Sequence, residues 1–596
     1  MDKIKDIYTQ NVDKYNKLTD RTGRILLYLS LSRLIVFIAG IALMVILWKV
    51  NQVNAVGSFL AALIIFIVLL KKYSDYSFRK EYYENLEGIN KDELRGLDDD
   101  YSCFKGGSEY IDPHHDFSHD IDLFGNDSLY QYLNRTCTGR GKDLLAEYLS
   151  SPSLLSNKMT ERQEAIKELS GLVQWRQEFR AYGMIGDTDA ALISDFNEWL
   201  REKPRYLNNK AFSVLRIFMP LLTILLLILT ITATIHYSLF VLIFLINLVI
   251  ISFNLRDINN IHSRVTKKHN MLKTLRHLID HFENHKFSSA YLNNLQKALS
   301  SDNGSASRSI DKLSKIIQAF DSRLNMLMAI PLDGMLLWDL QCINRLELWK
   351  RTANELLPQW FESLGQVDAL CSLANYARNN DTFCYPAISD DKGYLVARSI
   401  GHPLIPGHMR VNNDFSISKK GEIIIITGAN MAGKSTFLRT VAVNLILAMT
   451  GAPVCADKFI FTPCNIYSSM RTTDSLSDQE SYFYAELKRL RALKERLENN
   501  ENIFFLLDEI LKGTNSKDKS EGAQLFTERI IQYQATGMIA THDILLGKLS
   551  DNYNNIINRC FEIEIAGDEV KFDYILREGM TTKMNAAILM KQMGIV

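Results

Sequence analysis

Residues 422–436, with the sequence EIIIITGANMAGKST, decide the fold of the C-terminal third of the chain. Four consecutive isoleucines predict a strand buried on both faces, and the apolar pattern of residues 437–449 predicts a helix after it. Between them, GxxxxGKS is the spacing of a loop whose backbone N–H groups close around phosphate oxygens, aided by the dipole of the following helix. In such a loop Lys434 reaches the β- and γ-phosphates and the Ser435 hydroxyl ligates Mg²⁺. The predicted nucleotide-binding residues are Gly428, Ala429, Asn430, Met431, Ala432, Gly433, Lys434, Ser435 and Thr436.

Two further apolar runs end in side chains that suit the same chemistry. Residues 503–507 lead into Asp508 and Glu509, and residues 536–540 lead shortly into His542. At a strand end beside the loop, Asp508 is placed to ligate Mg²⁺ and Glu509 to polarise the attacking water. His542 is then placed to hydrogen-bond the γ-phosphate. The alternatives are an ordinary exposed strand end for the acidic pair and a helix cap for the histidine.

Apolar residues are concentrated in two other places. Residues 217–255 contain no Asp, Glu, Lys or Arg, and the polar group at 234–238 divides them into two segments of about 19 residues, each long enough to cross about 30 Å of hydrocarbon. A second pair, residues 34–48 and 53–70, is shorter and is joined by a short turn. We therefore predict four transmembrane helices in two hairpins. Buried helical hairpins in a large soluble core are the alternative.

The charges around these segments predict their orientation. Lys and Arg cluster before and after each hairpin, whereas the two turns between crossings hold one Lys and no Arg. Positive charge stays on the cytoplasmic side of a membrane. The first 24 residues are polar and do not have the pattern of a removable signal peptide. We expect a multi-pass membrane protein with both termini and the C-terminal domain in the cytoplasm.

Global composition says little about partners. Lys plus Arg and Asp plus Glu number 68 each, so any nucleic-acid surface has to be local. The eight cysteines form no CxxC pair and no zinc spacing, which is typical of reduced, packed thiols. Residues 256–325 are basic, with 12 Lys/Arg against 6 Asp/Glu. That span fits a solvated helix facing lipid headgroups, or a contact with a nucleic-acid backbone. Metal binding by His277, His281 and His285 is a further alternative that no nearby Cys or carboxylate cluster supports.

The motifs together resemble the ATPase domain of the MutS family. GANMAGKST at residues 428–436, LLDEILKGTNSKD at 506–518 and ATHD at 540–543 are similar to its GPNMxGKST, DEIxRGTSTxDG and ATH elements. The resemblance implies binding and hydrolysis of ATP with Mg²⁺. In the stretch ESYFYAEL at residues 480–487, it implies that Ser481 contacts the ATP of the opposite subunit. The implied partner is a second copy, in a homodimer formed through the ATPase domains.

The resemblance extends upstream and also has limits. IDLFG at residues 121–125, LNRTCTGR at 133–140 and LGQVDALCSLA at 364–374 look like parts of the family's core, or lever, domain. Only some 120 residues precede this core, and they contain no Phe-x-Glu wedge for insertion at a mismatch. Lys512 stands where the family has Arg, and Asn515 where it has Ser. These departures weigh against mismatch recognition but leave the nucleotide chemistry unaffected.

The predicted fold is an α/β P-loop NTPase domain of the MutS type, joined to a mainly α-helical lever and four transmembrane helices. The expected segments are a polar N-terminus (1–33), a first transmembrane hairpin (34–70), a cytosolic region with the start of the core (71–210), a second hairpin (217–255), the helical lever (256–397) and the ATPase domain (398–596).

The predicted function is that of a membrane-anchored ATPase whose ATP cycle moves the lever, with membrane lipid as a partner and double-stranded DNA as a target. The alternative is a mechanical ATPase or membrane scaffold that acts on protein or lipid without DNA. A transporter is a weaker option, because the apolar segments lack an internal carboxylate or Lys for a substrate pathway.

Overall fold

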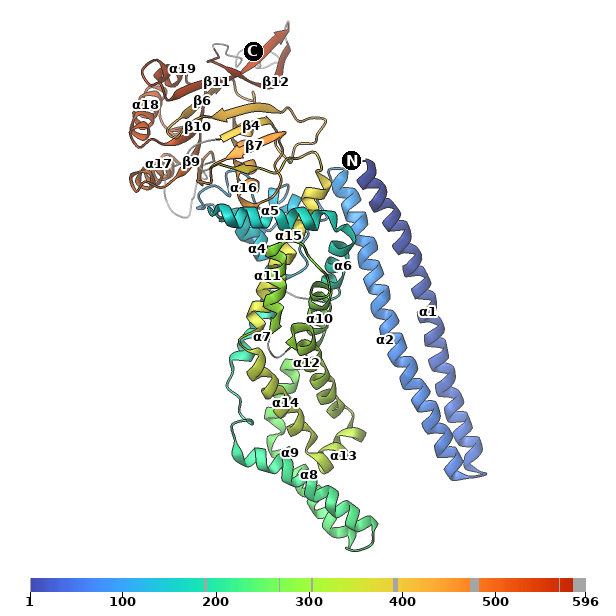
Figure 1. Cartoon of the computed structure of the whole chain (residues 1–596). Helices are drawn as coiled ribbons and strands as arrows, with labels where there is room; N and C mark the ends of the chain where they lie inside the picture. The colour runs from blue at the N-terminus through green and yellow to red at the C-terminus, as the bar shows by residue number, and fades with distance from the viewer. Residues whose placement is uncertain are drawn as a thin grey trace.

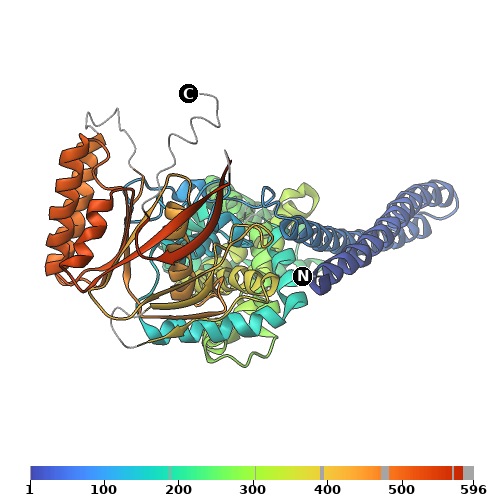
Figure 2. The ribbon, with the colours of Figure 1, turned by 90° about the horizontal axis from the view of Figure 1, so that it is seen from above.

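The computed structural model describes residues 2–186, 190–266, 268–301, 304–389, 395–471, 482–566 and 569–581. An α/β domain lies at one end of the molecule, and a stalk of helices leads away from it (Figure 1). A helical hairpin forms the far tip of the stalk. A longer hairpin runs beside the stalk with its tip toward the same end, and from above it projects from the body (Figure 2). The predicted combination of an α/β domain with a mainly helical remainder is therefore present.

A six-stranded sheet forms the centre of the α/β domain. Five strands are parallel, and one edge strand is antiparallel to its neighbour. The spatial order is β12 (Glu569–Glu578), β11 (Ile556–Ala566), β6 (Ile423–Gly428), β10 (Thr536–Thr541), β9 (Ile503–Asp508) and β8 (Asn465–Ser469). Every residue of β6 is buried, as expected of an apolar run covered on both faces. The three strands that carry the predicted site residues, β6, β10 and β9, are therefore adjacent and end at the same edge.

A second, four-stranded sheet covers the start of the domain. Its order is β3 (Ala387–Ile388), β7 (Lys458–Phe461), β4 (Leu395–Ile400) and β5 (Asn413–Ile417). Along the chain, α16 (Lys434–Thr450) follows β6 of the first sheet and precedes β7 of the second. Its residues are buried from Phe437 to Thr450, apart from Arg439. The other helices of the domain are α17 (Tyr482–Glu498), α18 (Ser516–Gln532) and α19 (Ile544–Gly547).

The helical body below the sheets depends on a buried carboxylate. Asp368, on α15 (Leu357–Asn379), accepts hydrogen bonds from the backbone N–H groups of Cys137 and Thr138 and from the Thr138 hydroxyl at 2.6 Å. Thr138 is in turn the N-cap of α4 (Gly139–Ser150), where its hydroxyl accepts from the Gly141 N–H. A Cβ atom at Gly141 would lie 2.2 Å from the Asp368 carboxylate. The polar residues of LNRTCTGR therefore serve to join α4 to α15.

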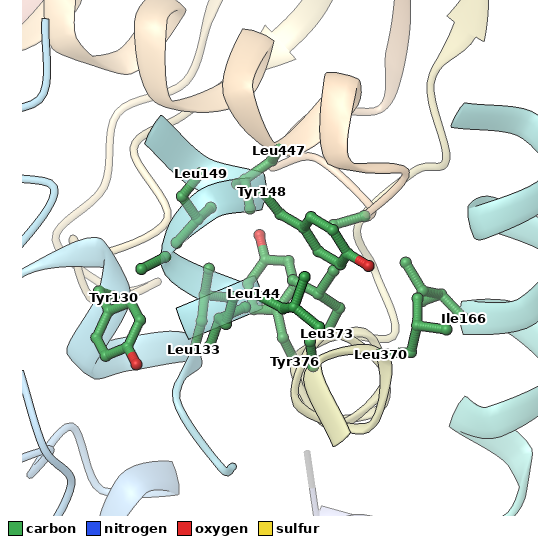
Figure 3. Close-up of a cluster of buried hydrophobic side chains, with 14 of the residues drawn as sticks. Tyr130, Leu133, Leu144, Tyr148, Leu149, Ile166, Leu370, Leu373, Tyr376 and Leu447 are labelled. Carbon is green, nitrogen blue, oxygen red and sulfur yellow. The ribbon is translucent and has the colours of Figure 1, made fainter. Parts of the chain in front are cut away.

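An apolar cluster continues from this joint into the α/β domain (Figure 3). Leu144 and Leu149 of α4, Leu373 of α15 and Leu447 of α16 all belong to this cluster, and all four are buried. The side chains of α16, α4 and α15 therefore form one continuous, closely packed core. The helix that begins at the phosphate loop thus rests directly on the helical body.

The stalk consists of helices that run between this body and the far tip (Figure 1). The helices of body and stalk are α3 (Leu129–Leu133), α5 (Ser156–Gly171), α6 (Val173–Met184), α7 (Ala190–Arg201), α10 (His269–Glu283), α11 (Ala290–Leu299), α12 (Ala306–Asp321), α13 (Met326–Leu336) and α14 (Trp338–Ala353).

Two helical hairpins carry the long apolar segments. Hairpin 1 consists of α1 (Asp2–Trp48) and α2 (Gln52–Leu97), and hairpin 2 of α8 (Lys210–Ile231) and α9 (Tyr237–Thr266). All four helices are long and apolar enough to cross a membrane by length and composition. In the most apolar 18 residues of each, only 6% are buried in hairpin 1 and 11% in hairpin 2. Such exposure is opposite to that of a hairpin inside a soluble core, which was the alternative.

Two local features differ from expectation. The polar N-terminal segment and the first apolar run form one continuous helix, α1, rather than separate elements. Helix α8 begins at Lys210, behind the N-cap Asn209, and not at residue 217 where the predicted apolar segment starts, so Pro220 lies inside the helix. The boundaries of the domains remain predictions.

Candidate nucleotide-binding site

The phosphate-type loop lies where the sequence predicts it, between β6 and α16. Residues 429–433 leave the buried end of β6, and α16 begins at Lys434. Met431 and Gly433 have positive φ, at 66° and 102°. Gly433 is the N-cap of α16 and lacks a side-chain cap bond, so the first N–H groups of the helix are left for a ligand. A Cβ at Gly428 would lie 3.0 Å from the Phe561 carbonyl on the neighbouring strand, so the start of the loop fits only a small residue.

Lys434 is held inside the loop. Its ammonium donates to the carbonyl oxygens of Gly428 and Ala429 at 2.8 and 3.0 Å. Burial lowers the pKa of Lys434, while the nearby carboxylates Glu509 and Asp508 act in the opposite direction. A cation buried to 5% exposure at a helix start is suited to phosphate oxygens, which would supply the negative charge it lacks.

Ser435 and Asp508 meet across the sheet. The Ser435 hydroxyl donates to the Asp508 carboxylate at 2.5 Å, although 73 residues separate them in sequence. Both offer oxygen ligands, which Mg²⁺ prefers, and Mg²⁺ is commonly held by one or two protein oxygens together with phosphate and water. No group of three metal-ligand side chains exists among the described residues. The pair therefore fits a Mg²⁺ ion that is held jointly with a nucleotide.

Glu509 and His542 form a second pair at this edge. The Glu509 carboxylate lies 3.2 Å from His542 Nδ1 and 4.0 Å from Lys519 Nζ. Burial raises the pKa of Glu509, but the hydrogen bond from His542 and the Lys512 and Lys434 cations outweigh it and lower the pKa overall. Glu509 is also in the left-handed region, with φ 52°. A carboxylate kept ionised at a strained strand end is suited to accept a proton from water.

A cavity of about 580 Å³ opens beside the loop. Its polar wall includes Lys434, Ser435 and Glu509, and its other wall is apolar. The apolar part is formed by Ile405, Pro406, Met409, Val411 and Tyr574. The combination offers a phosphate end and a separate surface for a flat, largely apolar group such as a nucleobase.

One positioning residue was not singled out from the sequence. Glu486 of α17 is 4% exposed and accepts the backbone N–H groups of Leu511 at 2.5 Å and Lys512 at 3.1 Å. Burial raises its pKa. Glu486 thereby fixes the turn that follows Glu509, in which Leu511 has φ 61°. A glutamate four residues into a helix carries no signal by itself, because only the fold brings it under this turn.

The site is also tied to the helical body. The Asp122 carboxylate accepts a hydrogen bond from the Arg439 guanidinium of α16 at 2.9 Å, and it forms an ion pair with Arg471. Asp120 accepts the Ser468 hydroxyl at 2.6 Å and the Arg471 N–H at 3.0 Å. Asp120, just before the IDLFG stretch, therefore connects the edge strand β8 to the body, and Asp122, within it, connects the loop helix α16.

The sequence-predicted site residues are thus largely brought together. Lys434, Ser435, Asp508, Glu509 and His542 lie at one edge of the sheet. Ser481 lies outside the described residues. The histidines proposed as metal ligands are engaged elsewhere: His281 Nε2 lies 3.0 Å from the Trp175 carbonyl, and His277 stacks on aromatic rings.

Comparison with known proteins agrees with these arrangements. Residues 115–374 match the family model described as MutS domain III, and residues 424–594 match MutS domain V. The chain belongs to the MutS family. An endonuclease MutS2 of Thermus thermophilus is 29% identical over 238 residues, 39% of this chain and 31% of that protein. A DNA mismatch repair protein MutS of Thermotoga maritima is 28% identical over 245 residues, covering 41% and 30%.

A DNA mismatch repair protein MutS of Fusobacterium nucleatum is 32% identical over 243 residues, 38% of this chain and 26% of the relative. The chain therefore spans less than a third of the length of these MutS-family relatives. The chain therefore matches two domains of the family, III and V, and only part of the length of each of these relatives.

Proposed function

We propose that this MutS-family protein binds and hydrolyses ATP with Mg²⁺. The observation that supports it is the convergence of Lys434, Ser435, Asp508, Glu509 and His542 beside a cavity with one polar and one apolar wall. Lys434 and the N–H groups of the loop bind the phosphates, and the apolar wall receives the base. Mg²⁺, when bound by Ser435 and Asp508, neutralises charge on the phosphate oxygens. Glu509 orients a water and accepts its proton, and His542 holds Glu509 in position.

The test is nucleotide binding by the purified full-length protein. Lys434→Ala removes the buried cation and is expected to abolish tight binding of a fluorescent ATP analogue. Lys458→Ala, an exposed lysine on β7 of the same domain, is the matched control and should bind like the parent chain. Equal binding by both variants would contradict the assignment of the loop.

We also propose that both hairpins span a membrane, with the termini and the α/β domain in the cytoplasm. Four apolar helices with exposed side chains support it, together with the Lys and Arg residues that flank them. Reporter tags inserted at Asn51 and His236 should then be accessible from outside the cell, and tags at the termini should not. Full-length protein that is monodisperse without detergent would contradict the proposal.

The lever movement and its target are the third part of the proposal. As in the mismatch repair relatives, the target would be DNA; alternatively, the lever acts on protein or lipid. The basic span 256–325 favours the alternative, because several of its cations are neutralised within the protein. Arg264 pairs with Glu202, Lys268 with Asp195, and Arg276 and Lys315 with Asp311.

A salt series of ATPase measurements distinguishes the two targets. If DNA is the target, duplex DNA should change the ATPase rate of the detergent-solubilised protein, and the effect should fall steeply as salt rises. If the lever acts on protein or lipid, duplex DNA should leave the rate unchanged at every salt concentration, while lipid bilayers change it.

Finally, we propose that two copies pair through their ATPase domains, with Ser481 of one chain serving the nucleotide of the other. The family resemblance is its support. Ser481→Ala and Lys434→Ala chains should each be inactive alone, and mixing them should restore part of the hydrolysis through one intact composite site. If the mixed chains assemble with each other but hydrolysis does not recover, Ser481 acts within its own chain, as a local helix cap.

A further inference from the structure

A third apolar segment lies against hairpin 2. Helix α13 and its flanks, residues 324–338, contain one acidic residue and no Lys or Arg. Leu324, Met328 and Ile330 are 72%, 53% and 43% exposed. The segment is too short for the roughly 20 residues that a membrane-spanning helix needs, so hydropathy alone does not identify it. Two exposed apolar side chains on one short helix, with a third just before it, nevertheless require a partner.

The packing of α13 places it deep beside hairpin 2. A Cβ at Gly334 would lie 2.2 Å from the ring of Phe244 on α9, so the backbone of α13 approaches α9 as closely as a glycine allows. Asn247 of α9 donates to the Gly334 carbonyl at 2.7 Å and to the Thr223 hydroxyl of α8 at 3.0 Å. Three helices therefore meet at one buried polar point, since Asn247 and Thr223 are both 0% exposed.

The depth of this point follows from the nearest charges. Arg256 is the first charged residue after the apolar stretch of α9, nine residues beyond Asn247, which corresponds to about 13 Å of helix. Arg216 is the last one before the stretch in α8, seven residues ahead of Thr223, or about 10 Å. Counted along both helices, Gly334 therefore lies about 10 to 13 Å from the nearest charged residues of hairpin 2, within the apolar part of the hairpin.

Both ends of the segment return to the level of these charges. Arg323, just before it, pairs with Asp339, just after it, at 3.0 Å. Gln341, in the first turn of α14, exchanges hydrogen bonds with the backbone and side chain of Arg216 at 2.7 and 3.1 Å. The chain thus leaves the charged level after Arg323 and comes back to it by Asp339.

We propose that residues 324–338 form a re-entrant segment that dips into the lipid layer beside hairpin 2, with lipid acyl chains covering Leu324, Met328 and Ile330. This rests on the proposed membrane anchoring. Backbone that turns inside a membrane has to be satisfied by protein groups, and the Asn247 amide does so for Gly334. The one acidic residue, Asp333, is 6% exposed and accepts the Asp339 N–H at 2.9 Å, so it faces protein rather than lipid. Helix α14 continues directly from the segment, so the stalk ends in a three-helix membrane unit.

The test is depth-dependent fluorescence quenching of the full-length protein in phosphatidylcholine nanodiscs. The variants Met328→Cys and Ile330→Cys each add one cysteine, which carries an environment-sensitive fluorophore. The parent chain, labelled in parallel, gives the signal of the native cysteines, which is subtracted. Leu245→Cys, 51% exposed on α9, reports on hairpin 2, and Leu155→Cys, 55% exposed at the start of α5, reports on water. Lipids carry a nitroxide either on the acyl chain or on the headgroup.

We expect acyl-chain nitroxides to quench the labels at Met328 and Ile330 about as strongly as the label at Leu245, and the label at Leu155 to be unaffected. Quenching at Leu245 alone would overturn the re-entrant segment and leave the membrane anchoring intact. Stronger quenching from the headgroup than from the acyl chain would place the segment on the surface and overturn its insertion. A blue-shifted label that no lipid quenches would show that protein, such as a second copy, covers the face. Absence of quenching at Leu245 as well would overturn the anchoring itself.

Discussion

The two hairpins are similar in composition but are attached to the protein in different ways. Hairpin 1 is fixed at its base by Glu93 of α2, which is 1% exposed. The Glu93 carboxylate accepts hydrogen bonds from the side chains of Arg135 at 2.6 Å, Asn375 at 2.9 Å and Asn379 at 3.0 Å. The Tyr8 hydroxyl of α1 donates to the same Asn379 at 2.8 Å. Hairpin 2 is attached at the far end of the stalk instead, where Asn247 of α9 donates to the Gly334 carbonyl of α13 and His262 Nε2 of α9 lies 2.8 Å from the Asp321 carboxylate of α12.

The two hairpins are therefore attached at opposite ends of the stalk. Asn375 and Asn379 lie at the end of α15 nearest the α/β domain, so hairpin 1 is tied to the part of the helical body next to that domain. Hairpin 2 is separated from that site by the length of the stalk (Figure 1). If ATP hydrolysis moves the stalk, as we propose, a rotation of the stalk displaces hairpin 2 relative to hairpin 1.

The largest effect is expected at the nucleotide site. Glu509→Gln removes the proton acceptor while keeping its size, so ATP should bind but turn over about 10²- to 10⁴-fold more slowly. With hydrolysis stalled, spin labels at Leu60 of hairpin 1 and Leu245 of hairpin 2 should show an ATP-dependent change in separation. Hydrolysis at the parent rate would contradict the role of Glu509, and an unchanged separation would contradict the contrast between the hairpins.

The next effect concerns the base of hairpin 1. Glu93→Ala leaves Arg135 buried without its partner, and breaking a buried ion pair in this way costs about 3–5 kcal/mol. Glu84→Ala is the matched control on the same helix, because its pair with Lys80 is exposed and such pairs contribute about 0.3–0.5 kcal/mol. Thermal unfolding and protease sensitivity of α1 and α2 measure both. Equal effects of the two substitutions would mean that the base is not what fixes hairpin 1.

A smaller effect is expected at hairpin 2. Asn247→Leu removes the hydrogen bonds to Thr223 and Gly334, and hydrogen bonds between helices in membranes contribute about 0.6 kcal/mol on average and up to about 1.7 kcal/mol. Asn254→Leu, which removes a bond only to the Ile250 carbonyl of its own helix, is the control. The measurement is hydrogen exchange of α13 in detergent, which should quicken in the first variant and stay unchanged in the second.

The contrast also shows what sequence could and could not predict. The loop, Asp508 and His542 were found because strand, turn and helix signals there are local and each chemical role needs a particular residue type. The two hairpins were found because a helix long and apolar enough to cross a membrane leaves a local signal, a run of about 20 apolar residues. The helical body was identified only through resemblance, because its organising residue, Asp368, acts on Thr138 across 230 positions.

The residues that were missed share this long-range character. Glu486 reaches the turn after Glu509 only when α17 lies beneath it. Residues 324–338 are apolar but shorter than a membrane span, and Gly334 gains meaning only from its contact with Phe244. Local pattern carries no information about which distant segment becomes a neighbour, so such sites emerge from packing alone.

The smallest effect is a pH dependence at the contact between hairpin 1 and the stalk. His277 of α10 stacks on Phe78 of α2, with 4.5 Å between ring centres, and on Tyr182 of α6 at 5.4 Å. Burial, with the Arg276 and Lys273 cations beside it, lowers the pKa of His277 to about 4, and Asp280 opposes this only in part. An unfolded histidine has a pKa of about 6.5, so between pH 6.5 and 4 the folded form binds fewer protons than the unfolded form.

Stability from this contact should therefore be complete above about pH 6.5 and decline as the pH falls toward 4. His277→Phe keeps the stack and removes the proton, so its stability should depend less on pH in that window. The pKa of His281 is also lowered by burial, so the variant should lose part of the slope rather than all of it. Protease sensitivity of hairpin 1, followed from pH 8 to pH 4, compares the two chains. Identical profiles would show that His277 does not titrate at this contact. A steeper decline in the variant would mean that the stack depends on the imidazole itself.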